Sequence, residues 1–287
     1  MYQVVSNFLT YAEMFVPGQR QPLTLLQNLL DAGLFSNYVM YQNEREVRIA
    51  GNALAEVMVS TEAVTYRFKD EVRSHPIADP LKQVESALAS LPIENWTAYG
   101  YVSFDLSRFY YPYSKAIQQP LLYFLVPETE LCITAKGVRI RSFQPLTKVQ
   151  AALVGESDSK NYVPTLPALD EGDRDRYQDR VDAAIQAIRS GDLHKAIISR
   201  SVQVKGNMDV LGTYTLGSKS NNCARSYCLQ LENIAAVGFS PEILLQVSPD
   251  GFVMTNPLAG TRPRGENLAE DARLKHELFT DAKEVKE

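Results

Sequence analysis

The sequence predicts an α+β fold in which antiparallel sheets are flanked by helices. Helical and strand-like segments come in blocks along the chain instead of alternating one by one, which disfavours a doubly wound parallel sheet. The links between neighbouring strand-like segments are short, as they are between antiparallel strands. With 287 residues, of which 45% are hydrophobic, the chain is long enough to bury a large core.

The N-terminal part, residues 1–150, is predicted to be rich in strands. Two helices are expected here, one from the spacing of Leu23, Leu26, Leu29 and Leu30, and one over "DPLKQVESALAS" at 79–90. The strand-like segments share β-branched and aromatic residues. They are "SNYVMYQ" (36–42), "EVRIAG" (46–51), "AVTYRFK" (63–69), "WTAYGYVSFDL" (96–106), "PLLYFLV" (120–126) and "TELCITAKGVRIRSF" (129–143).

Residues 151–175 lose this periodicity and collect Gly, Ser, Pro and acidic residues, which predicts a surface connection. An apolar stripe at helical spacing follows, and Gly191 suits the end of that helix. The stripe consists of Tyr177, Val181, Ala184, Ile185 and Ile188. Further strands are expected at 194–204, 225–232, 234–240, 243–248 and 251–256, and a charged helix from about Asn267 to Glu287.

Composition disfavours several classes of function. The net charge of -5 offers no basic surface for nucleic acid. Cys132, Cys223 and Cys228 are scattered without Cys-x-x-Cys spacing, which disfavours a disulfide framework or a zinc site and fits a reducing cytoplasm. No apolar run approaches the roughly 18 residues that span a bilayer. We therefore expect a cytoplasmic protein with no nucleic-acid or membrane partner. We also expect a monomer.

Lys195 stands at the head of the apolar stretch "HKAIISRSVQV", which reads as a buried strand. Alternation would place Lys195 on the same face as Ile197 and Ser199. A lysine at the end of a strand commonly extends to water along its aliphatic stem. The functional alternative is a lysine held in a cleft.

Glu242 follows a strand in "GFSPE" and precedes three apolar residues, Ile243 to Leu245. Burial beside such residues would favour the protonated carboxyl group that a proton donor needs, although a turn glutamate in water is the simpler alternative. In "NPLAGTRPRG", the small residues Ala259 and Gly260 and the hydroxyl of Thr261 could bind a carboxylate through backbone and side-chain donors. An ordinary turn would explain the same residues.

Glu284 and Glu287, in "DAKEVKE", are three residues apart and would share one face of the last helix. Such a pair can supply oxygen ligands to Mg²⁺. The alternative is a solvated helix face, which is common in charge-rich stretches.

Taken in order, "HKAIISR", "GFSPE", "NPLAGTRPRG" and "DAKEVKE" resemble the motif series of the chorismate-utilising enzymes, which include anthranilate, aminodeoxychorismate, isochorismate and salicylate synthases. The resemblance covers residues 177–287 specifically. Residues 213–247 are most similar to the salicylate synthases of siderophore pathways. Before residue 150 the resemblance rests on "YGYVSFDLSRFYY" and "LVPETEL".

This resemblance implies a layered α/β/β/α fold forming a single domain over 1–287, with the chorismate-binding motifs in 176–287. It implies a Mg²⁺-dependent salicylate synthase that converts chorismate through isochorismate to salicylate and pyruvate. Lys195 would activate water, Glu242 would protonate the departing hydroxyl group, residues 259–261 would hold the ring carboxylate, and Glu284 and Glu287 would bind Mg²⁺. Lys195 and Glu242 should not form a salt bridge, because each role requires the neutral form that pairing opposes.

Two features depart from the salicylate branch of this family. Asn256 stands where isochorismate and salicylate synthases usually carry an acidic residue, and "RPRG" is more typical of anthranilate synthases. An isochorismate synthase and an enzyme like anthranilate synthase component I therefore remain possible. Family members continue well past this length, so we expect the domain to be incomplete at its C-terminus. A truncated, non-catalytic relative would also fit this length.

Overall fold

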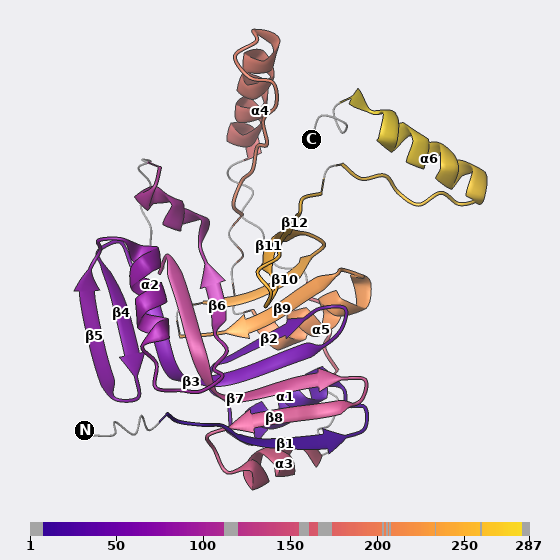
Figure 1. The fold of residues 1–287 in the computed structure, drawn as a ribbon. Coiled ribbons are helices and arrows are strands. Elements are labelled where there is room, and N and C mark those ends of the chain that lie inside the picture. Colours follow the sequence, from indigo (N-terminus) through magenta and orange to yellow (C-terminus); the bar gives the residue numbers. More distant parts are fainter. Residues whose placement is uncertain are drawn as a thin grey trace.

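A computed structural model describes residues 8–111, 120–154, 161–165 and 174–282, apart from residues 203, 205, 207, 233 and 259. The structure combines a large antiparallel sheet with helices, which confirms the predicted fold class (Figure 1). The ten-stranded sheet has the central order β1 (Ala12–Pro17), β8 (Gly137–Ser142), β7 (Leu122–Thr134), β3 (Val47–Val59), β2 (Tyr38–Gln42), β9 (Arg225–Gln230) and β10 (Ala235–Ser240). Three further strands branch from it, β4 (Ala63–Phe68), β5 (Glu71–Pro76) and β6 (Tyr99–Val102).

The sheet branches because β3 and β7 are each 13 residues long and extend beyond the ends of their shorter partner strands. The first part of β3 pairs with β2, and its last five residues pair with β4. The first part of β7 pairs with β6, and its last six residues pair with β8. The two long strands pair with each other throughout, with one irregularity between Ala53 and Ala55.

Three helices cover one face of this sheet and bury the largest core cluster. They are α1 (Pro22–Asp31), α3 (Leu146–Val154) and α5 (Val210–Ser220). In α1, the predicted leucine spacing directs Leu25, Leu26 and Leu29 into the core, where each side chain contributes roughly 1.5–3 kcal/mol of burial free energy. A fourth helix, α2 (Pro80–Ala89), packs against β3 and β4.

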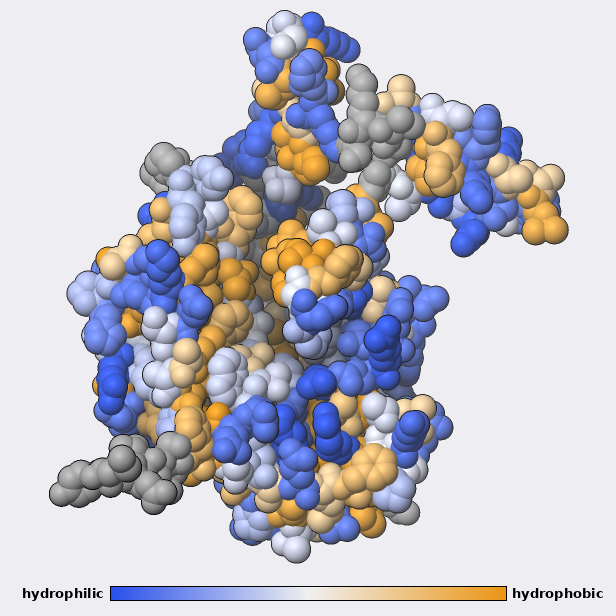
Figure 2. All heavy atoms as spheres, viewed as in Figure 1, coloured by the Kyte–Doolittle hydropathy of each residue, from blue (hydrophilic) through white to orange (hydrophobic). Residues whose placement is uncertain are grey.

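The C-terminal elements lie outside this core. Helices α4 (Arg174–Arg189) and α6 (Leu268–Thr280) extend beyond the sheet, and β11 (Ile243–Val247) and β12 (Val253–Asn256) form a separate two-stranded sheet (Figure 1). No side chain described in α4 or α6 is buried. Figure 2 shows hydrophobic residues gathered over the β11–β12 hairpin and on α4. Leu245 in β11 and Phe252, directly before β12, are both exposed.

Several elements differ from the sequence prediction, which did not expect β1, β5, α3 or α5 and which divided β7 between two segments, 120–126 and 129–143. No strand forms over residues 194–202, where the backbone is irregular and exposed, because no described strand lies beside it to accept its hydrogen bonds. Helix α6 ends at Thr280 instead of continuing to Glu287. Helix α3 continues to Val154, so the surface connection begins later than residue 151.

Candidate functional site

Glu242 lies between β10 and β11 and lines a cavity of about 770 Å³. The other walls come from the turn between β2 and β3, including Arg45 and Glu46, from Arg225 at the start of β9, and from the β11–β12 hairpin. The size is within the range of small-molecule sites. Charged groups of both signs line it, so it suits a polar ligand.

The β11–β12 hairpin brings two of the sequence motifs together. Ile243 pairs with Asn256, and the backbone N–H of Leu258 donates a hydrogen bond of 3.2 Å to the Glu242 carboxylate. The turn that joins the strands contains Gly251 at a positive φ of 84°, which glycine adopts without steric cost. "GFSPE" and "NPLAG", which are separated in sequence, therefore share one end of the hairpin.

Glu242 is exposed, and so are Leu244 and Leu245, at 90% and 64% relative exposure, while Ile243 is partly buried. The expectation that these residues bury Glu242 is therefore wrong for this structure. The physical reason is that β11 and β12 pair only with each other, and a two-stranded sheet shields little from water.

The segment after β12 continues from the hairpin towards α6. Gly260 is partly buried and Thr261 is exposed, while Ala259 lies outside the described residues. Arg262 forms an ion pair of 3.0 Å with Asp281, just after α6. Among the predicted carboxylate-binding residues, the structure thus places Gly260 and Thr261 on a link between the Glu242 hairpin and α6.

Lys195 lies in the exposed irregular segment that follows α4. This segment is attached to α4, because the Tyr177 hydroxyl donates to the backbone oxygen of Ile198 (3.2 Å) and the Arg200 guanidinium lies 5.7 Å from the centre of the Tyr177 ring. No ion pair joins Lys195 to Glu242, both of which are described. The structure does not bring the two residues into direct contact.

The predicted Mg²⁺ ligands, Glu284 and Glu287, lie outside the described residues. Within the described ranges, no three His, Cys, Asp or Glu side chains form a group that could hold a metal ion. The carboxylates of Glu284 and Glu287 are oxygen ligands of the kind that Mg²⁺ prefers. None of the described helices is long and apolar enough to cross a bilayer.

Sequence reasoning missed Arg45 and Arg225 as cavity residues. They are far apart in sequence and belong to none of the motifs. The pairing of β2 with β9 places Gln42 opposite Ser226. It therefore brings the end of β2, which precedes Arg45, close to the start of β9 at Arg225. The one signal in the sequence that could have indicated Arg45 is its place between the two predicted strands, 36–42 and 46–51.

Comparison with known proteins gives consistent relatives. The model of the family described as "chorismate binding enzyme" matches residues 36–287. The salicylate synthase of Mycolicibacterium paratuberculosis is 28% identical over 256 residues, which cover 87% of this chain and 56% of the relative. Anthranilate synthase component 1 2 of Haloarcula marismortui is 41% identical over 113 residues, which cover 39% of this chain and 21% of the relative.

Two solved structures share the fold. Anthranilate synthase component I from Streptococcus pneumoniae TIGR4 superposes with a TM-score of 0.67 and 20% identity, over 84% of this chain and 58% of that chain. MenF, the menaquinone-specific isochorismate synthase from Escherichia coli, gives a TM-score of 0.58 and 14% identity, over 96% of this chain and 60% of that chain. The 287 residues thus span little more than half the length of the salicylate synthase relative and of these two structures.

Proposed function

Because this chain belongs to the chorismate binding enzyme family, we propose that the protein containing it is a salicylate synthase. It would convert chorismate to isochorismate, by adding water at C2 as the C4 hydroxyl leaves as water, and then eliminate pyruvate to give salicylate. The observation that carries this choice is Lys195 within "HKAIISR", because the family's water-using members carry a lysine there and its amine-transferring members generally lack one. Similarity to a salicylate synthase over 87% of the chain supports it.

Each residue would act on a stated atom. Lys195 removes a proton from the water that attacks C2, and Glu242 gives a proton to the departing C4 oxygen. The backbone around Ala259 and Gly260 and the Thr261 hydroxyl hold the ring carboxylate. The position of Glu242 supports its placement in the site, because its carboxylate lies at the cavity and accepts the N–H of Leu258, two residues before Gly260.

Mg²⁺ would be held by Glu284 and Glu287. When bound, this cation supplies positive charge that offsets the dianionic substrate. Loss of pyruvate from isochorismate requires no further acid or base, only a bound conformation that brings the reacting atoms together. The two glutamates would therefore serve substrate binding more than proton transfer.

The proposed roles require a closed form of the site. Lys195 and Glu242 are both exposed here, and neutral lysine is favoured only where water is excluded. In the closed form they would face the substrate from opposite sides. The proposal also includes a cytoplasmic monomer whose product enters siderophore or related secondary-metabolite synthesis.

Two observations favour a second candidate, the amine-transferring anthranilate synthase. Asn256 and the "RPRG" stretch resemble that branch, and the Haloarcula relative is 41% identical over 113 residues. An isochorismate synthase that lacks the elimination step, and a relative without catalytic activity, would each give a different set of products from chorismate.

Incubation of the protein that contains this chain with chorismate and Mg²⁺, with and without ammonium, separates these possibilities. The products are resolved by chromatography. We expect salicylate and pyruvate in equal amounts. Isochorismate alone would indicate a synthase without elimination, anthranilate formed only with ammonium would indicate the amine-transferring activity, and unchanged chorismate would indicate no catalysis.

The variant Lys195→Ala tests the assignment of the base. It should abolish turnover, while Lys219→Ala, which removes an exposed lysine from α5, should leave the rate unchanged. Normal turnover by Lys195→Ala would refute the role of Lys195.

A further inference from the structure

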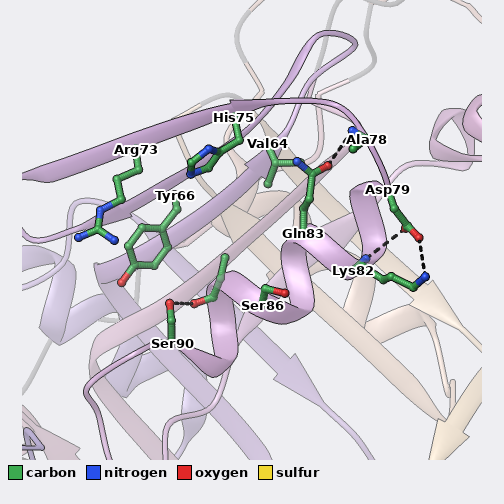
Figure 3. Close-up of a pocket in the computed structure, with 11 residues that line it drawn as sticks. Val64, Tyr66, Arg73, His75, Ala78, Asp79, Lys82, Gln83, Ser86 and Ser90 are labelled. Carbon is green, nitrogen blue, oxygen red and sulfur yellow. Dashed lines mark hydrogen bonds and ion pairs between the residues drawn. The ribbon is translucent and has the colours of Figure 1, made fainter.

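A second cleft, of about 370 Å³, lies between α2 and the β4–β5 hairpin (Figure 3). It shares no lining residue with the cavity at Glu242. The register of the hairpin builds one wall, because Val64 pairs with His75 and Tyr66 pairs with Arg73. Cross-strand partners and alternate residues point to the same face, so these four side chains line the cleft together.

The opposite wall is the α2 helix, which hydrogen bonds fasten to the end of β5. The Gln83 side chain accepts from the backbone N–H of Ala78 (3.0 Å) and donates to the backbone oxygen of Pro76 (2.9 Å). Asp79 caps the first turn of α2 by accepting from the N–H of Lys82 (3.3 Å). These bonds fix the separation of the two walls without any ligand, as in a preformed site.

The interior of the cleft is apolar and aromatic, with unused hydroxyl groups. Val64 is 4% exposed, and the Tyr66 ring is partly buried. Burial raises the pKa of Tyr66, so its hydroxyl group stays protonated and can donate. Within the described part of the chain, neither the Tyr66 hydroxyl nor the Ser86 hydroxyl has a hydrogen-bond partner.

Cationic side chains stand at both ends of the cleft (Figure 3). Arg73 directs Nε and Nη2 to one oxygen of Glu71, at 2.9 and 2.6 Å, which leaves Nη1 as a donor. Lys82 lies 3.3 Å from Asp79, and His75 lies between these ends. The lining thus offers donors to an anion beside an apolar surface.

We propose that this cleft binds a small planar aromatic carboxylate. The ring would lie against Val64 and Tyr66, and the carboxylate would accept hydrogen bonds from Arg73 Nη1 and from the Tyr66 hydroxyl. An anion without an apolar face, such as phosphate, would leave the interior of the cleft unfilled. An uncharged aromatic molecule would leave the arginine donor unused.

Calorimetric titration of the full chain with benzoate, and with benzamide as its uncharged counterpart, tests the proposal. We expect benzoate to bind with a Kd on the order of 1 mM or below, and benzamide at least tenfold more weakly. Amide NMR shifts caused by benzoate should fall within residues 64–90. Because the readout is binding, it does not depend on turnover of chorismate.

Two variants and two controls complete the experiment. Arg73→Gln should weaken benzoate binding at least tenfold, and Ser86→Trp, at an exposed helix position, should block the cleft. Lys148→Gln on α3 and Glu242→Gln at the other cavity should leave binding unchanged. Absence of binding, equal binding of benzamide, shifts outside 64–90, or unchanged binding by both cleft variants would overturn the proposal.

Discussion

Glu130 is a buried carboxylate in the sheet that is stabilised by its neighbouring side chains. It is 2% exposed, yet its carboxylate accepts hydrogen bonds from Arg48 (2.9 Å), Arg141 (3.2 Å) and the Tyr99 hydroxyl. Burial and the neighbouring negative charge raise the pKa of Tyr99, so that its hydroxyl group remains a donor. A buried carboxylate is tolerated when its oxygens are paired in this way.

Glu130→Gln should lower the free energy of unfolding by about 2 kcal/mol, because two largely shielded guanidinium groups, of Arg48 and Arg141, each lose one of their two carboxylate partners. Urea unfolding followed by circular dichroism measures this. Glu85→Gln, on the exposed face of α2, is the matched control and should change stability by less than about 0.5 kcal/mol. Equal effects of the two variants would show that the cluster contributes nothing specific.

The buried Cys228 thiol should make the free energy of unfolding depend on pH in the alkaline range. Burial raises the pKa of Cys228 from its ordinary value of 9.0 to about 11. A raised pKa in the folded state stabilises the protein fully below pH 9, and this contribution is lost as pH rises to about 11, at a cost on the order of 2 kcal/mol. In Cys228→Ala, the unfolding free energy should fall less steeply over this interval. Identical slopes for the variant and the wild type would contradict the assignment.

At the scale of elements, the helices and strands that were predicted correctly pack against other described parts of the chain. Helix α1 and strand β2, which was expected at 36–42, bury residues in the main core. The stretch 194–202 has the same β-branched character, but strand formation needs a neighbouring strand, which local sequence does not encode. Helix α5 was missed because its apolar residues are interrupted by glycine and threonine, and its helical state depends on packing against β9 and β10.

Helix α5 begins at a cap that should be measurable. The Asp209 side chain accepts from the N–H of Gly212 at 2.9 Å, directly before the buried residues Leu211 and Tyr214 engage the core. Asp209→Ala should cost about 1 kcal/mol of unfolding free energy, whereas Asp209→Asn should retain most of the stability. If both variants lost the same amount, the negative charge and not the cap would be responsible.

At the scale of the whole molecule, the protection of amide hydrogens against exchange with solvent is expected to vary along the chain. Amide hydrogens of β3 and β7 should exchange most slowly, because both strands are paired on two sides within the core. Residues 194–200 should exchange fastest among the folded segments, since Ile197 is 84% exposed and no strand forms there. Hydrogen exchange read by mass spectrometry tests this, and comparable protection in both regions would contradict the fold described.

The candidate site was predictable only in part at this scale. Motif order placed Glu242 and the residues after Asn256 in one site, and the hairpin brings them to the same end. The position of Lys195 relative to them was not predictable, because its segment is held to α4 and not to the sheet. Arg45 and Arg225 were unpredictable because a cavity wall depends on strand pairing across the whole sheet.

Central to the proposed function is the attack of water, activated by Lys195, at C2 of chorismate on the way to salicylate. The most direct measurement is mass spectrometry of the product formed in water labelled with oxygen-18. We predict salicylate that carries a single heavy oxygen, bound to the ring and not in the carboxylate. Salicylate without the label, or no salicylate at all, would contradict this mechanism.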